Sequence, residues 1–148
     1  MIQRKQTLFL LIAFVLTVVC MSVQVATLLG NDSIAFAKVY NLFLADGQGH
    51  YTFSSAPLFV MLLLSALLSL VSIFMYMKRK LQAAMCVVNM IVLVAWYVFL
   101  AVLPQTTGGQ IHLLWPVVLP AVSVILQFMA RKGILADEKL VRSLDRIR

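Results

Sequence analysis

The chain alternates four long apolar runs with short polar segments. The runs cover residues 7–29, 57–77, 81–103 and 111–130, and none of them contains Asp, Glu, Lys or Arg. Each holds about 20 residues, enough for an α-helix to cross a hydrocarbon core about 30 Å thick. The pattern predicts an all-α membrane protein with four transmembrane helices, built as a single domain over residues 1–148.

Composition and charge agree with this prediction. Apolar residues make up 63% of the chain and charged residues 11%, which is far from the balance of a soluble globular protein. The formal net charge is +7. Because the basic residues flank apolar runs, we expect them to meet the lipid bilayer and not nucleic acid.

The basic residues also predict an orientation. Of the 12 Lys and Arg residues, all except Lys38 fall at 4–5, 78–80 and 131–148. With four spans these three clusters share one side of the membrane, and basic residues near span ends are retained in the cytoplasm. We therefore expect both termini to be cytoplasmic and residues 30–56 to form an external loop.

The predicted external loop has two alternative structures. Residues 39–44 and 50–53 are β-prone and flank the Gly-rich segment 45–49, which favours a small β-hairpin. A helix over 34–44 competes, because the apolar residues of that segment also fall at helical spacing. In either structure the aromatic side chains are expected to cap the bundle or to lie among lipid headgroups.

Small and polar residues recur at helical spacing inside the runs. Such residues favour helix interfaces in lipid, because they allow backbones to approach and amides to find partners. We expect a compact bundle with the following residues inward: Ala13, Thr17, Cys20, Gln24 and Thr27; Ser65, Ser69, Ser72 and Tyr76; Gln82, Cys86, Asn89 and Trp96; Pro116, Pro120, Ser123 and Gln127.

Three amides are the candidate intramembrane polar contacts. Asn89 and Gln127 fall in the cytoplasmic half, and Gln24 falls near the outer interface, level with Trp96 and Tyr97. These amides either line a substrate path or hold helices together. Adhesion between helices is the ordinary role of such residues and is the favoured interpretation.

Prolines set further expectations. The segment 104–109 contains Pro104 and two glycines and is expected to end the third helix at 103. Pro116 is expected near the first turn of the fourth helix, and Pro120 is expected to kink that helix from within.

We expect no catalytic, cofactor or metal site. Ionisable residues deep in a membrane mark pumps, ion-coupled carriers and many intramembrane enzymes, and the runs lack them. His50 and His112 are two lone histidines, a poor basis for a metal or haem site. Cys20 and Cys86 lie in different spans without a C-x-x-C motif, which disfavours a disulfide oxidase.

The tail, residues 131–148, is predicted to be a short cytoplasmic amphipathic helix. Asp137 fits an N-cap and Glu138 to Arg142 fits an i,i+4 pair. The helix is expected to lie along the membrane surface or to dock on a partner. The candidate partner contacts are Leu140, Val141, Leu144, Ile147, Arg142 and Arg146.

The opening residues 1–8, MIQRKQTL, and the closing residues 136–148, ADEKLVRSLDRIR, carry a family resemblance. On these motifs the whole chain resembles domain of unknown function 4293, a family of small four-span membrane proteins of Bacteroidota. The resemblance implies an inner-membrane location in a Gram-negative cell. It implies no activity and no site residues.

Two functions remain open. The first is a non-enzymatic accessory or assembly protein whose cytoplasmic tail contacts a membrane or cytoplasmic protein partner. The second is a binder or carrier of a neutral or apolar small molecule within the bundle. Enzyme activity is disfavoured because the spans lack the usual acids and bases.

Overall fold

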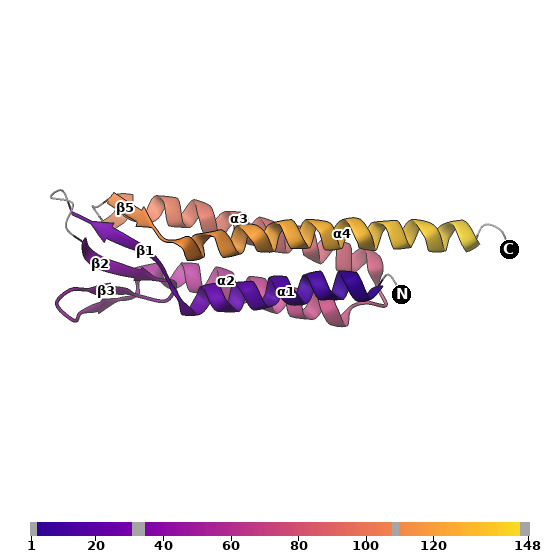
Figure 1. Ribbon diagram of the computed structural model, residues 1–148, viewed down its shortest axis with the longest axis horizontal. Coiled ribbons are helices and arrows are strands. Elements are labelled where there is room, and N and C mark those ends of the chain that lie inside the picture. The colour runs from indigo at the N-terminus through magenta and orange to yellow at the C-terminus, as the bar shows by residue number, and fades with distance from the viewer. Residues whose placement is uncertain (1–2, 31–34, 108–109, 146–148) are drawn as a thin grey trace.

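The computed structural model describes residues 3–30, 35–107 and 110–145. Within these residues four long helices lie side by side, with a sheet at one end of the bundle (Figure 1). The helices are α1 Gln3–Ser22, α2 Ala56–Phe74, α3 Arg79–Thr107 and α4 Val118–Asp145. All four are long and apolar enough to cross a membrane. The four expected helices are confirmed, and the all-α class is wrong because of the sheet.

The sheet has five strands in the order β4-β3-β2-β1-β5, and every neighbouring pair is antiparallel. Two short 3-10 helices, η1 and η2, precede α2 and α4. The bounds are β1 Gln24–Leu29, β2 Ala35–Tyr40, β3 Leu44–Asp46, β4 Tyr51–Thr52, η1 Phe53–Ser55, β5 Gln110–Leu113 and η2 Trp115–Val117.

The first apolar run is a helix only as far as Ser22, so the expected helix over 7–29 is wrong at its end. Residues 24–29 form β1, the strand with a partner on both sides. Thr27 pairs with Lys38 of β2 on one side and with His112 of β5 on the other. These two ladders supply the backbone hydrogen bonds that a helix would otherwise provide. Gln24 and Thr27 therefore belong to a strand and not to a helical stripe.

The hairpin expected in the external loop is confirmed. Strands β3 and β4 pair around a turn in which Gly49 has a positive φ of 83°, a conformation that favours glycine. The alternative helix over 34–44 is wrong, because β2 occupies 35–40 and a turn follows it. Residue 34 lies outside the described residues.

The prolines lie differently from expectation. Helix α3 continues through Pro104 to Thr107, so its expected end at 103 is wrong; the hydroxyls of Thr106 and Thr107 donate to the Leu103 carbonyl at 2.8 and 3.0 Å. Pro120 lies in the first turn of α4, where a missing backbone donor costs no helical hydrogen bond. The expected interior kink at Pro120 is therefore wrong.

The core consists of two apolar clusters. The larger lies at the sheet end and includes Leu28, Leu62, Leu93 and Trp96, and the smaller includes Leu10, Cys86, Ala130 and Ile134. The inward stripes are confirmed for most of their members. Fully or nearly fully buried are Ala13, Thr17, Cys20, Ser65, Ser69, Ser72, Gln82, Cys86, Asn89, Trp96, Pro116, Pro120, Ser123 and Gln127. Tyr76 is 57% exposed because it lies beyond the end of α2, and Gln24 and Thr27, in β1, are half-buried.

Asn41, in the turn after β2, joins the sheet to three helices. Its Nδ2 donates to the Cys20 carbonyl in the last turn of α1 at 2.6 Å, and its Oδ1 accepts from Trp96 Nε1 of α3 at 3.1 Å. Its backbone carbonyl accepts from the Phe59 amide in the first turn of α2 at 3.1 Å. Helix ends leave such backbone groups without helical partners. Asn41 is fully buried and supplies the partner at two of them.

Candidate functional site

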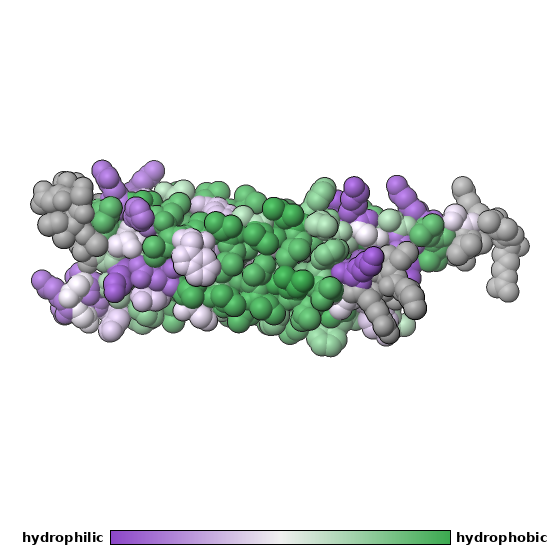
Figure 2. Space-filling model, viewed as in Figure 1, coloured by the Kyte–Doolittle hydropathy of each residue, from purple (hydrophilic) through white to green (hydrophobic). Residues whose placement is uncertain are grey.

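The end of the bundle opposite the sheet, which we call the basic end, gathers the basic clusters. Helix α1 begins there, the turn between α2 and α3 lies there, and α4 ends there (Figure 1). A broad apolar surface separates it from the polar sheet end (Figure 2). The basic side chains described at this end are Lys5, Lys78, Arg79, Lys80, Arg131, Lys132, Lys139 and Arg142.

Helix α4 runs without interruption from the apolar region into the tail, so the tail is not a separate helix. Asp137 is a buried residue well inside α4, and its expected role as an N-cap is wrong. The Gln6 Nε2 of α1 donates to Asp137 Oδ2 at 2.7 Å. Gly133 makes room for this contact, because a Cβ there would lie 3.1 Å from Gln6 Cγ and Nε2. The contact fixes the tail against α1.

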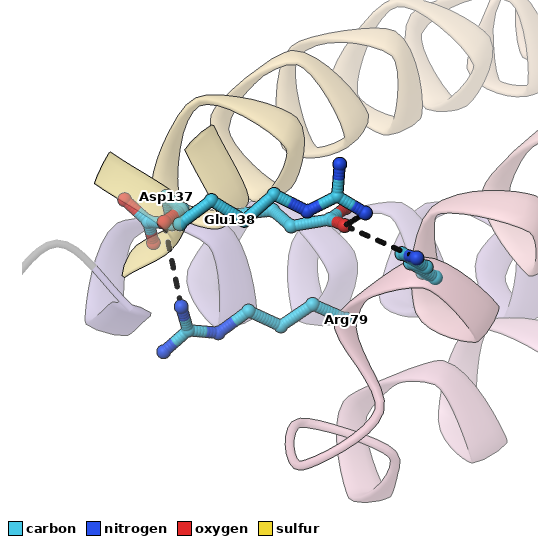
Figure 3. A network of polar contacts seen from close by, with 5 residues as sticks. Arg79, Asp137 and Glu138 are labelled. Atoms are coloured by element: carbon cyan, nitrogen blue, oxygen red, sulfur yellow. Dashed lines mark hydrogen bonds and ion pairs between the residues drawn. The ribbon is translucent and has the colours of Figure 1, made fainter. Parts of the chain in front are cut away.

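Arg79, Asp137 and Glu138 join the α2–α3 turn to α4 (Figure 3). Arg79 Nη1 donates to the Asp137 backbone carbonyl at 3.4 Å. Glu138 Oε1 lies 3.9 Å from Lys80 Nζ and 3.4 Å from Arg142 Nη2, which confirms the expected i,i+4 pair. The two cations are mostly exposed, and exposed ion pairs contribute about 1 kcal/mol or less. The network therefore orients the side chains more than it stabilises the bundle.

A groove of about 780 Å³ lies between the α2–α3 turn and α4. It combines exposed apolar side chains with basic ones, and Glu138 is its one acidic residue among those described. Its lining residues are Tyr76, Met77, Lys78, Arg79, Lys80, Leu81, Glu138, Val141 and Arg142. Met77 is 82% exposed, so the groove presents an apolar surface within a basic rim.

The candidate partner contacts of the tail are partly described. Leu140 and Val141 are exposed large apolar residues, and Val141 lines the groove. Arg142 also lines the groove and pairs with Glu138. Leu144 lies in α4 but its side chain is outside the described part, as are Arg146 and Ile147. Leu140, Val141 and Arg142 are thus available at the end of a continuous helix.

The candidate amides Asn89 and Gln127 lie in a buried polar layer, which we define as Ser65, Ser69, Asn89 and Gln127. Asn89 Nδ2 donates to the Ser65 carbonyl at 3.1 Å and to Ser69 Oγ at 2.7 Å. Ser65 Oγ, Asn89 Oδ1 and both polar atoms of the Gln127 amide have no hydrogen-bond partner among the described residues. The layer therefore holds more donors and acceptors than it satisfies.

Helix geometry places Asn89 and Gln127 at one level. Asn89 follows Arg79 by ten residues and Gln127 precedes Asp137 by ten, so both lie about 15 Å from the Arg79–Asp137 contact. The antiparallel pairing of α3 and α4 keeps this register, because the Tyr97 hydroxyl donates to the Val117 carbonyl near the sheet end. The layer separates the two apolar clusters of the core.

Gln24, the third candidate amide, is not part of this layer. Its Nε2 donates to the Ala26 carbonyl at 3.1 Å and to Thr27 Oγ1 at 3.0 Å, so its contacts stay within β1. The contacts of Asn41 and Gln6 had no signal in the sequence. A single Asn in a predicted loop, or a single Gln beside a basic cluster, does not indicate a buried partner.

The histidines and cysteines lie apart. His50 and His112 are exposed, and Cys20 and Cys86 are buried free thiols. Over residues 3–30, 35–107 and 110–145, no three His, Cys, Asp or Glu residues come together in a way that could hold a metal ion.

Comparison with known proteins agrees with the resemblance seen in the terminal motifs. The sequence model of domain of unknown function 4293 (DUF4293) matches residues 2–147. The chain belongs to this family. No curated protein matches the chain. For this DUF4293 protein the family description assigns no activity, so the functional argument rests on the basic end and the polar layer.

Proposed function

We propose that the protein crosses the inner membrane of a Gram-negative cell four times, with both termini in the cytoplasm. The support is the distribution of charge, because all Lys and Arg residues except Lys38 belong to three clusters, and the described members of each cluster lie at the basic end. A reporter fused after Arg148 tests the orientation, and an external readout would contradict it. The location follows from the family resemblance and is tested by membrane fractionation.

At the basic end the protein acts as a non-enzymatic accessory or assembly protein. Its partner is a membrane or cytoplasmic protein that presents an acidic amphipathic helix. The groove between the α2–α3 turn and α4 supports this proposal. Met77, Leu81 and Val141 offer apolar contacts there, and basic residues outnumber acidic ones in its lining. Four basic residues line the groove against the one acid, Glu138. An amphipathic helix fits such an apolar surface through its own apolar face.

Site-specific crosslinking from the groove tests the proposal. A photoreactive group at Val141 is expected to capture one protein in stoichiometric yield, and the same group at Val98 is the matched control. Val98 is 59% exposed but lies in α3 within the apolar belt. Charge reversal by Lys80→Glu with Arg142→Glu is expected to abolish the capture. Equal capture from both positions, or capture that survives charge reversal, would refute the proposal.

A second function, a carrier or binder of a neutral small molecule, is favoured by Gln127. A buried amide without partners costs about 1–3 kcal/mol, and a ligand that hydrogen-bonds to it would recover this energy. The ligand would be small, polar and uncharged, since the layer offers donors and acceptors but no charge. Native mass spectrometry of the protein purified in mild detergent tests it. No retained small molecule, or equal retention by the Gln127→Leu variant, would refute this function.

A further inference from the structure

A second groove at the basic end lies along α4 and has a different charge balance. Its volume is about 410 Å³, and its described lining consists of Phe128, Arg131, Lys132, Leu135, Ala136 and Lys139. We call it the α4 basic groove. Three of these six residues are cations and none is acidic. Phe128 adds a large exposed apolar side chain, at 55%.

The two acids of α4 whose side chains are described, Asp137 and Glu138, bind partners outside this groove. Asp137 accepts from Gln6, and Glu138 pairs with Lys80 and Arg142. In contrast, the cations of the α4 basic groove form no ion pair with any residue in the described ranges. Positive charge is therefore left uncompensated on this face of the helix.

Arg131 gives the groove its most specific feature. Its Nε is buried and has no hydrogen-bond partner among the described residues. A buried donor on a charged group is costly when it is not satisfied. The planar guanidinium suits two parallel hydrogen bonds to a phosphate, which a lysine cannot form in the same way. Arg131 thus favours a phosphate-like acceptor over a single point charge.

Depth places the groove at the edge of the hydrocarbon region. Trp115, 70% exposed, marks the opposite interface, where exposed tryptophans of membrane proteins concentrate. Arg131 follows it by 16 residues, or about 24 Å, and Lys139 by 24 residues, or about 36 Å. A hydrocarbon core about 30 Å thick that begins at the level of Trp115 therefore ends between Arg131 and Lys139. Phe128 therefore lies at the level of acyl chains, and the cations lie at and beyond the boundary.

We propose that the α4 basic groove binds an anionic phospholipid. Arg131 holds the phosphate, Lys132 and Lys139 neutralise the headgroup, and Phe128 and Leu135 pack against the acyl chain. The apolar wall and the position at the hydrocarbon boundary favour a lipid over a soluble anion. The proposal requires only that the helices cross a bilayer. It does not depend on the protein partner proposed for the other groove.

Native mass spectrometry of the full chain, exchanged into nanodiscs of phosphatidylcholine with phosphatidylglycerol, tests this site. We expect retained phosphatidylglycerol to exceed phosphatidylcholine. A cation near the membrane surface contributes about fivefold, so Arg131→Gln should lower retention about fivefold and removal of all three cations about a hundredfold. Arg131→Lys, which keeps the charge without the guanidinium, is expected to fall between wild type and Arg131→Gln.

Lys78→Gln with Lys80→Gln is the matched control, because it removes charge from the first groove only. Retention in this control should fall by less than in the variant without the three groove cations. A size-exclusion profile verifies the fold of each variant. Equal retention of both lipids, an equal loss in the control, or displacement of the lipid by millimolar inorganic phosphate would overturn the proposal. None of these results affects the crosslinking experiment at Val141, which tests the protein partner of the other groove.

Discussion

Replacement of Asn41 by Leu provides a direct test of the junction between sheet and bundle. The substitution keeps the branched shape of the side chain but removes both of its hydrogen bonds. The Cys20 carbonyl and the Trp96 indole N–H are then left without the partners they now have at 2.6 and 3.1 Å. The backbone contact of Asn41 with Phe59 does not depend on the side chain and should persist.

The expected loss in the free energy of unfolding is large for a single substitution. Each buried group left unpaired costs about 1–3 kcal/mol, so the two together predict a loss of about 2–6 kcal/mol in the free energy of unfolding. Asn89→Leu is the matched control. It removes the bonds from Asn89 to Ser65 and Ser69, but the Ser65 carbonyl lies within α2 and the Ser69 hydroxyl can turn to another acceptor. Its expected cost is about 0.6–2 kcal/mol.

Tryptophan fluorescence during titration with sodium dodecyl sulfate measures the difference. The chain has two tryptophans, and Trp115→Phe removes the exposed one, so emission then reports the buried Trp96. We expect the Asn41→Leu variant to unfold at a lower detergent fraction than Asn89→Leu, and its folded spectrum to change. Equal midpoints for the two variants would refute the assigned role of the Asn41 side chain as the partner of Cys20 and Trp96.

Three further predictions use the same titration. Gln127→Leu should raise stability by about 1–3 kcal/mol in the absence of a ligand, because it removes a buried amide without partners; a loss would show that the amide is satisfied. Gly133→Ala should destabilise the wild type by displacing Gln6, but in a Gln6→Ala background it should stabilise α4 by about 1 kcal/mol, the helix propensity difference; the same sign in both backgrounds would contradict the contact. Glu138→Gln should change stability by about 1 kcal/mol or less, and less still at high salt, because Lys80 and Arg142 are mostly exposed. A larger effect would show that burial of Glu138, 19% exposed, strengthens these ion pairs.

The helices and their inward faces could be predicted from the sequence because both depend on local patterns. A span must be apolar, and a small or polar residue repeated at helical spacing has to face protein when the other faces meet lipid. Thr17, Ser69, Asn89 and Ser123 are buried for this reason. The orientation expected from charge and the single domain stay predictions.

The sheet could be predicted only in part, because its pairing is distant in sequence. The hairpin of β3 and β4 has a local signal, the glycines of its turn. Strand β1 has none, since its apolar residues continue a helical run and its partners are 35–40 and 110–113. Residues 24–29 form a strand because they pair with a strand on each side, and both partner strands are distant in sequence.

The prediction of a separate tail helix is wrong for a related reason. The sequence presents Asp137 as a polar residue before an apolar stripe, the usual signal of a new helix start. What decides its role is Gln6, 131 residues away, whose amide makes burial of the carboxylate possible. The N-cap signal at Asp137 therefore fails, because a distant donor, Gln6 Nε2, binds the carboxylate oxygen that would otherwise cap a helix.

The regions of the bundle differ in how completely their buried polar groups are hydrogen-bonded. At the sheet end Asn41 satisfies two helix termini, and at the basic end Gln6 and Arg79 hold Asp137. The polar layer between them keeps four side-chain atoms without a partner in the described part of the chain. Each end keeps one such atom among the described residues, Ser55 Oγ at the sheet end and Arg131 Nε at the basic end, so the polar layer is the largest group of unsatisfied atoms. The middle of the bundle therefore offers a bound molecule more hydrogen bonds than either end. For this reason a substitution at Gln127 should alter ligand retention without altering capture at Val141 or lipid retention at Arg131.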